Sequence, residues 1–239
     1  MDPLTQGVVG AVASQQSVNK KTYLLATIIG FLSGLTPDLD IFIRSNEDPL
    51  LALEFHRQFT HSLIFIPIGG LICATVFYYL FAKRNDLTFK KTYIFSILGY
   101  GTHGLLDSCT SYGTQLFWPF SNHRVSWNTI SIIDPMFTIP LLIFIIIAVV
   151  KKNKIFSRIA ISWIIMYFIL GIVQHERAKY FGKQIALSRG HTPVTILVKP
   201  SIANLLVWKI IYSTKKNYYV DAVKIGLKNK IYEGSKINK

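Results

Sequence analysis

The feature that most constrains this chain is an uncharged run of 21 residues, Ser62–Ala82. At about 1.5 Å per residue, a helix of this length crosses the roughly 30 Å hydrocarbon core of a bilayer. The chain is also 51% hydrophobic and only 16% charged, and its mean hydropathy is +0.37. This composition excludes an ordinary soluble domain, so we expect a membrane protein.

Further apolar stretches predict more than one membrane helix. They are Tyr23–Pro37, Thr92–Leu106, Pro135–Val150 and Ile159–Val173. Each is shorter than the usual span of about 20 residues, so half-buried or broken helices are expected among them. Leu4–Gln16 is rich in Gly and Ala and predicts a shallower helix that packs closely. Residues 1–173 therefore predict an all-α polytopic bundle of about five to six membrane-embedded helices.

Charge placement predicts the orientation of this bundle. Lys and Arg accumulate on the cytoplasmic side of short loops. Alternate connections carry Lys20, Lys21, Lys83, Arg84, Lys90, Lys91, Lys151, Lys152, Lys154 and Arg158. With these inside, the motifs "PDLD", "HRQFTH" and "HGLLD" gather on the extracytoplasmic face of a bacterial-type inner membrane. The N-terminus opens with Asp2 and lacks a basic n-region, so no cleavable signal peptide is expected.

The motif "HGLLD" places His103 and Asp107 at positions i and i+4, on one face of a helix. A carboxylate near hydrocarbon is costly unless it is paired or bound to a metal. A ligand pair is favoured here, and a structural His–Asp hydrogen bond is the alternative. Asp38 and Asp40 are two residues apart, so both reach one site only on a turn. The alternative role for them is to cap the next helix.

His56 and His61 diverge on a continuous helix because they are five residues apart. They meet only if the chain breaks near Thr60, a good N-cap for a helix starting at His61. Arg57 and Arg124 are expected to bind a phosphate or lipid headgroups. Asp134 precedes Pro135 and is expected to be the N-cap of a helix that begins at this proline. His123, His175 and His191 are not expected to be ligands.

Taken as a set, these groups predict a metal site. Imidazole and carboxylate ligands without thiolates suit zinc, manganese or iron. Cys73 lies in mid-span and Cys109 at the outer end of another helix, so neither a disulfide nor a thiolate ligand is expected. The sequence has no G-x-S-x-G, Walker or CxxC motif. The chemistry indicated is water activated by a divalent metal.

Several motifs in their order resemble one known family. "MDPLTQGVVGA", "PDLD", "HRQFTHS", "HGLLDSCTSYGTQLFWPFS" and "ISIIDP" resemble the YdjM-like inner-membrane proteins. The likeness extends to "VKPSIANLLVW" and "YYVDAV". That family is described as membrane-bound metal-dependent hydrolases, distantly similar to zinc-dependent phospholipase C and P1-type nucleases.

The resemblance implies that the metal-binding motifs are occupied by Asp38, Asp40, His56, His61, His103 and Asp107. Family members often carry a histidine where this chain has Gln6. This departure leaves one ligand, and so the number of metal ions, open.

Residues 174–239 differ in character from the rest of the chain. They hold 13 Lys and Arg against three acidic residues, which is +10 of the chain's net charge of +14. "QHERAKYFGKQIALSRG" predicts a helix that continues from the fifth span and stops at Gly190. Beyond it, about three strands are expected, with "STKKN" as a hairpin turn and "NKIYEGSKINK" as a frayed tail. This small basic α+β appendage contacts anionic lipid headgroups or is simply a solubilising surface, and no nucleic-acid motif is present.

The sequence thus predicts a metal-dependent hydrolase that cleaves a phosphoester of a lipid or lipid-linked substrate at the outer membrane boundary. Asp38 or Asp40 is the expected general base, and Arg57 or Arg124 is expected to neutralise phosphoryl charge. Two alternatives remain. A transporter would use the same groups as a proton or metal-ion relay, and a non-catalytic scaffold would use any metal structurally.

Overall fold

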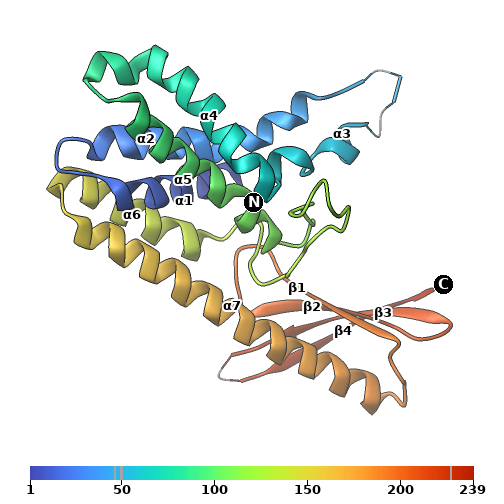
Figure 1. Ribbon diagram of the computed structural model, residues 1–239. Helices are drawn as coiled ribbons and strands as arrows, with labels where there is room; N and C mark the ends of the chain where they lie inside the picture. Colours follow the sequence, from blue (N-terminus) through green and yellow to red (C-terminus); the bar gives the residue numbers. More distant parts are fainter. Residues whose placement is uncertain (46, 49–50, 227) are drawn as a thin grey trace. The chain divides into compact units, whose positions relative to one another are not determined.

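The computed structural model (Figure 1) describes residues 1–45, 47–48, 51–226 and 228–239, and these residues form seven α-helices, several short 3-10 and π-helical turns, and four strands. The helices are α1 (Pro3–Ser14), α2 (Tyr23–Leu35), α3 (Leu51–Phe55), α4 (Ile66–Phe77), α5 (Phe89–Ser108), α6 (Pro135–Lys151) and α7 (Lys154–Ser188). The strands are β1 (Thr195–Pro200), β2 (Val207–Ser213), β3 (Asn217–Lys224) and β4 (Lys230–Asn238).

The chain divides into two units, which we name and describe separately. The helical unit comprises Met1–Ser126 and Phe137–Ile164. The sheet unit comprises Trp127–Met136 and Ile165–Lys239. The division of the chain into a catalytic part, 1–173, and an appendage, 174–239, stays a prediction.

Three helical segments among the described residues are long and apolar enough to cross a membrane. They are Tyr23–Phe42, Leu63–Asn85 and Lys154–Ser188. The first two are not uniform α-helices, because 3-10 turns cover Thr36–Phe42 and Leu63–Phe65 and a π-helical turn covers Tyr78–Ala82. The membrane class is thereby supported, but the count of five to six embedded helices is not. α6 is apolar but short, and α5 carries Lys90, Lys91, His103 and Asp107.

Close contacts between α1, α2 and α5 form the interior of the helical unit. A Cβ on Gly99 of α5 would lie 2.5 Å from the carbonyl oxygen of Gly30 in α2, so these backbones meet directly. α1 is buried at nine of its 12 positions, as its small residues predicted. Because α1 is packed inside the protein, it does not need the length of a membrane-spanning helix.

The sheet unit is an antiparallel meander in the order β1-β2-β3-β4. A Cβ on Gly182 of α7 would lie 3.0 Å from Ile210 and 3.3 Å from Ile196, so the second half of this helix packs on one face of the sheet. The predicted helix end is confirmed, because α7 stops at Ser188 and Gly190 has φ +70°. The predicted hairpin is also confirmed, since Ser213 pairs with Tyr218 across it.

The three predicted strands are confirmed as β1, β2 and β3, but the prediction of a frayed tail was wrong. Residues 230–238 form β4, whose Ile237 pairs with Tyr218 of β3. All nine residues of β4 are exposed. Backbone hydrogen bonds, rather than an apolar face, hold this strand, so the side-chain pattern gave no signal for it.

Candidate metal centre

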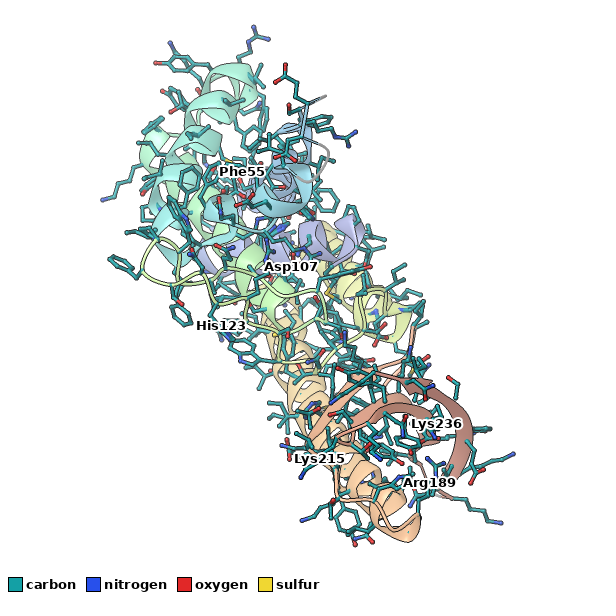
Figure 2. The ribbon with its side chains drawn as sticks, turned by 90° about the vertical axis from the view of Figure 1, so that its right-hand side faces the viewer. Phe55, Asp107, His123, Arg189, Lys215 and Lys236 are labelled. Carbon is teal, nitrogen blue, oxygen red and sulfur yellow. The ribbon has the colours of Figure 1, made fainter. Side chains whose placement is uncertain are left out.

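The predicted ligands come from three segments of the helical unit. Asp38 and Asp40 lie in the 3-10 turn after α2, and His56 and His61 lie between α3 and α4. His103 and Asp107 occupy the last two turns of α5 (Figure 2 labels Asp107). His61, His103 and Asp107 are almost fully buried, at 2%, 0% and 0% exposure.

The approach of His61 to α5 depends on a glycine. A Cβ on Gly104 would lie 2.1 Å from the carbonyl oxygen of His61. The segment before α4 therefore lies directly against the backbone of α5, next to His103. His103 and Asp107 share a helical face, as their spacing predicted, yet each contacts groups from other segments.

Hydrogen bonds at Nδ1 determine which ring nitrogen carries the proton in each of the two buried, neutral imidazoles. His103 Nδ1 lies 2.6 Å from the carbonyl oxygen of Gly34, which can only accept, so this nitrogen carries a proton. Thr60 Oγ1 donates to Asp40 Oδ2 at 2.8 Å and so accepts from His61 Nδ1 at 2.9 Å. When neutral, both rings therefore carry their lone pair on Nε2.

The two lone pairs face each other. His61 Nε2 and His103 Nε2 are 3.0 Å apart, and Asp38 Oδ1 lies 3.4 Å and 3.3 Å from them. Asp107 Oδ2 is 3.7 Å from His61 Nε2. Such a convergence of electron-rich atoms is unfavourable unless a cation lies among them, either a proton or a metal ion.

The protonation of His61 reflects this arrangement. Burial alone would lower the pKa of His61, but its hydrogen bonds to Asp38 and Asp40 and the charge of Asp107 outweigh burial and raise it. A proton thus relieves the repulsion where no metal is bound, and a metal ion would compete with that proton.

The donor set fits a divalent metal. One ligand atom from each of Asp38, His61, His103 and Asp107 lies within 4.8 Å of the others. Two imidazoles and two carboxylates without a thiolate suit zinc, manganese or iron. A second group, Asp38, Asp40 and His56, shares Asp38 with the first.

Asp40 lies behind the first group rather than within it. His56 Nδ1 is 2.7 Å from its Oδ1, and the backbone amide of Arg57 donates to its Oδ2 at 3.1 Å. Together with Thr60, these contacts orient His56 and His61. From this 3-10 turn, Asp38 lies near His103 and Asp40 bonds His56, and both carboxylates lie within 3.4 Å of a ring nitrogen of His61.

The prediction that Thr60 caps a helix starting at His61 was wrong. The chain turns at Arg57, whose φ is +64°, and α4 begins only at Ile66. The Thr60 hydroxyl is used by Asp40 instead. This turn in the chain nevertheless places the ring centres of His56 and His61 5.8 Å apart.

Asp107 is surrounded by donors. Arg57 Nε lies 3.0 Å from its Oδ2, and Gln6 Nε2 donates to its Oδ1 at 2.8 Å. The Met1 ammonium pairs with the same Oδ1. Gln6 is thus fully buried beside the cluster. Among the described residues, buried Gln6 Oε1 and Arg57 Nη1 have no hydrogen-bond partner.

Two pockets flank these residues. The first, which we call the arginine pocket, has a volume of 360 Å³ and is lined by His56, Arg57, Tyr112, Gly113 and Arg124. The second, the apolar pocket, has a volume of 250 Å³ and is lined by Thr36, Leu39, Asp40, Ile43, Thr60, Phe65, Gly69, Ile72 and Tyr100. Two arginines and a histidine line the arginine pocket, whereas mainly aliphatic and aromatic side chains line the apolar pocket. The hydrogen-bonded pair Asp40 and His56 connects them, because His56 lines the arginine pocket and Asp40 lines the apolar pocket.

The two arginines are held differently. Arg124 donates to the carbonyl oxygens of Glu54 and His56, at 3.0 and 3.2 Å. The Arg57 guanidinium lies 4.9 Å from the centre of the Tyr112 ring. Sequence reasoning missed Tyr112, which only the folded chain brings to the site, and it assigned Thr60 to a helix cap rather than to Asp40 and His61.

Other titratable residues lie outside both metal-binding groups found among the described residues. Asp134 accepts a hydrogen bond from the Tyr167 hydroxyl, at 2.7 Å, within the sheet unit. His175 contacts Glu176, and His191 contacts Tyr212. His123 is exposed in a loop (Figure 2).

Comparison with known proteins identifies the family to which the chain belongs. The sequence model of the family described as YdjM inner membrane protein matches residues 1–178. The chain is 25% identical over 198 residues to YfhP of Bacillus subtilis (strain 168), a protein described as uncharacterized. That match covers 82% of this chain and 58% of YfhP, so the chain spans less than two thirds of this relative. No solved structure matches the chain.

Proposed function

Because the chain belongs to the YdjM inner membrane protein family, we propose that it is a membrane-bound, metal-dependent hydrolase acting on a phosphoester. The observation that carries the proposal is the convergence of His61 Nε2, His103 Nε2 and Asp38 Oδ1, with lone pairs directed at one point. A divalent ion bound there would lower the pKa of water toward about 7 and so supply a nucleophile at neutral pH.

The chain's own groups hold the ligands in place. The Gly34 carbonyl orients His103, and Thr60 with Asp40 orients His61. Fixing an imidazole through its other nitrogen sets both the tautomer and the direction of the lone pair. Asp38 and Asp107 add negative charge, which favours a divalent over a monovalent cation.

Arg57 is the residue we assign to the phosphoryl group. Its Nε is held by Asp107, and its buried Nη1 has no partner among the described residues. A guanidinium N–H in a partly dry pocket stabilises charge that develops on phosphoryl oxygens. Arg124 lines the same pocket and positions the segment of His56 through carbonyl contacts.

His56 is the residue we assign to proton transfer. Asp40 bonds its Nδ1, so the lone pair of the neutral ring is on Nε2, and the ring lines the arginine pocket. This arrangement makes Asp40 act through His56 rather than as the base itself. The rival assignment, His56 as a ligand of a second metal with Asp38 and Asp40, gives a different metal count.

A lipid or lipid-linked substrate is proposed from the apolar pocket. Leu39, Ile43 and Ile72 line it beside Asp40, so an acyl or isoprenoid chain would bind within reach of the metal ligands. The three candidate spans support a membrane location. We propose that the site faces the extracytoplasmic side, on the basis of the positive-inside rule.

The test measures metal content and hydrolysis together. Detergent-purified wild type is compared with the His103→Ala/Asp107→Ala double variant, by elemental mass spectrometry and by phosphate release from phospholipids and lipid-linked phosphates. Near-stoichiometric metal and turnover, both lost in the variant, would support the proposal. Metal binding without turnover on any lipid phosphate would favour a scaffold, and metal movement across vesicles would favour a transporter. A folded wild type that binds no metal after reconstitution would end the hydrolase proposal.

A further inference from the structure

The sheet unit holds a pocket of its own, which we call the lysine pocket. It has a volume of 370 Å³ and lies between the loop after α7 and the turn that joins β2 to β3. Its polar lining includes His191, Thr192, Thr214, Lys215, Lys216 and Asn217, and none of the described residues that line it is acidic. Figure 2 shows Lys215 and Arg189 in this unit.

A chain of hydrogen bonds leads from a buried acid to this pocket. Arg189 donates from Nη1 and Nη2 to the two carboxylate oxygens of Asp221, at 2.7 and 3.0 Å. Its Nη1 also donates to the Tyr212 hydroxyl oxygen at 3.2 Å. These contacts raise the pKa of Arg189, with the Asp221 hydrogen bonds as the main cause. Asp221 therefore neutralises the charge of Arg189, so Arg189 does not add an unpaired positive charge to the pocket.

The same chain determines the tautomer of His191. Because the Tyr212 hydroxyl already accepts from Arg189, its one proton can be donated to His191 Nδ1, which lies 2.9 Å away. A neutral His191 then carries its proton on Nε2, the nitrogen that Tyr212 does not use. The imidazole lines the lysine pocket, so this N–H is a donor for a ligand.

Aromatic packing holds the ring in this orientation. The centres of the His191 and Tyr219 rings are 4.5 Å apart, and Tyr219 is stacked on Tyr212 with 4.8 Å between centres. Tyr212 is fully buried. A donor held by a buried network loses little freedom when it binds a ligand.

The charge around this donor is positive. Lys215 and Lys216 are exposed at the rim of the pocket, and residues 174–239 carry +10 of the net charge. We propose that the lysine pocket binds a phosphate group, with His191 and Thr192 as directed donors and Lys215 and Lys216 as countercharges. Charge-assisted hydrogen bonds to phosphate are the strong ones, and lysine binds phosphate as a point charge. This site is separate in its residues from the candidate metal centre and does not depend on the proposed hydrolysis.

The test follows the reactivity of His191 in the full-length protein. Diethyl pyrocarbonate acylates neutral imidazoles, and peptide mass spectrometry reports the rate at each histidine. In detergent, inorganic phosphate is titrated against sodium chloride at equal ionic strength. We expect phosphate to slow His191 modification in a saturable manner and to leave exposed His123 unchanged.

Two charge-matched double variants separate the pocket from general electrostatics. Lys215→Gln/Lys216→Gln should lose the protection, whereas Lys209→Gln/Lys224→Gln should keep it. Both variants remove two charges from exposed lysines of the same unit, so folding should survive in each. Equal protection in both variants, or by chloride, would overturn the proposal.

A second arm identifies the source of the phosphate. The protein is placed in nanodiscs of phosphatidylcholine with or without phosphatidic acid. Protection by inorganic phosphate in detergent assigns a free phosphate, and protection only in discs with phosphatidic acid assigns a lipid headgroup. Absence of protection in both arms would show that the pocket is not a phosphate site.

Discussion

His61 Nε2 and His103 Nε2 lie 3.0 Å apart, and neither ring can turn its proton toward the other without losing a hydrogen bond at Nδ1. The interior of the helical unit thus contains a cluster of groups that are close enough together to hold a metal ion. The two histidines are 42 residues apart in the chain.

Removal of the metal should destabilise the protein. A ligand that binds only the folded state adds about 2.7 kcal/mol at ~100 times its Kd. We expect a chelator to lower the melting temperature of metal-loaded wild type, measured by fluorescence in detergent. The His103→Ala/Asp107→Ala variant should show no chelator response, and an equal response there would place the metal elsewhere.

Metal affinity should rise with pH. The pKa of His61 is raised, so the proton is retained to a higher pH than on a free histidine and competes with the metal. Apparent affinity should therefore be low below that pKa and increase as pH rises through it, when measured by calorimetry. A pH-independent affinity would mean that His61 is not a ligand.

Asp40→Asn should weaken metal binding without abolishing it. Asp40 contacts His56 and Thr60 but supplies none of the four atoms of the first metal-binding group. Loss of such an orienting carboxylate costs about 10- to 100-fold in metal affinity. Asp86→Asn is the control, because Asp86 is exposed in the loop before α5. A complete loss of metal would make Asp40 a ligand itself.

His56→Gln should separate the two assignments of His56. If this residue transfers protons, the variant keeps the wild-type metal content and loses about 100- to 10,000-fold in kcat/KM. If it is a ligand of a second ion, metal content falls as well. Elemental mass spectrometry and phosphate release on the same sample decide between them.

Gly104→Ala should displace the His61 segment. The new Cβ would lie 2.1 Å from the His61 carbonyl oxygen, which is backbone and cannot turn away. Overpacking of this kind costs about 1–3 kcal/mol, so we expect a lower melting temperature and weaker metal binding. Gly101→Ala is the matched control, since its Cβ meets only the Ile66 side chain at 3.3 Å. Similar losses in both variants would argue against a specific role for Gly104.

Part of the site could be predicted from spacing alone. His103 and Asp107 share a face because the helical repeat is independent of the rest of the fold. The separation of roles between Asp38 and Asp40 could not be predicted, because it depends on a 3-10 turn and on Thr60, which lies 20 residues further along the chain. Tyr112 and Gly34 contribute through a ring face and a backbone carbonyl, which leave no mark in the sequence.

The sequence by itself determined the membrane class, the helix over 174–188 with its stop at Gly190, and the pool of candidate metal ligands. These depend on local hydropathy, helical periodicity and residue chemistry. Only the tertiary structure decided which nitrogen of each histidine is free, where the chain breaks before α4, and that the exposed tail forms a fourth strand. Each of these is set by a hydrogen bond or a backbone approach between distant segments, and such contacts exist only once the chain has folded.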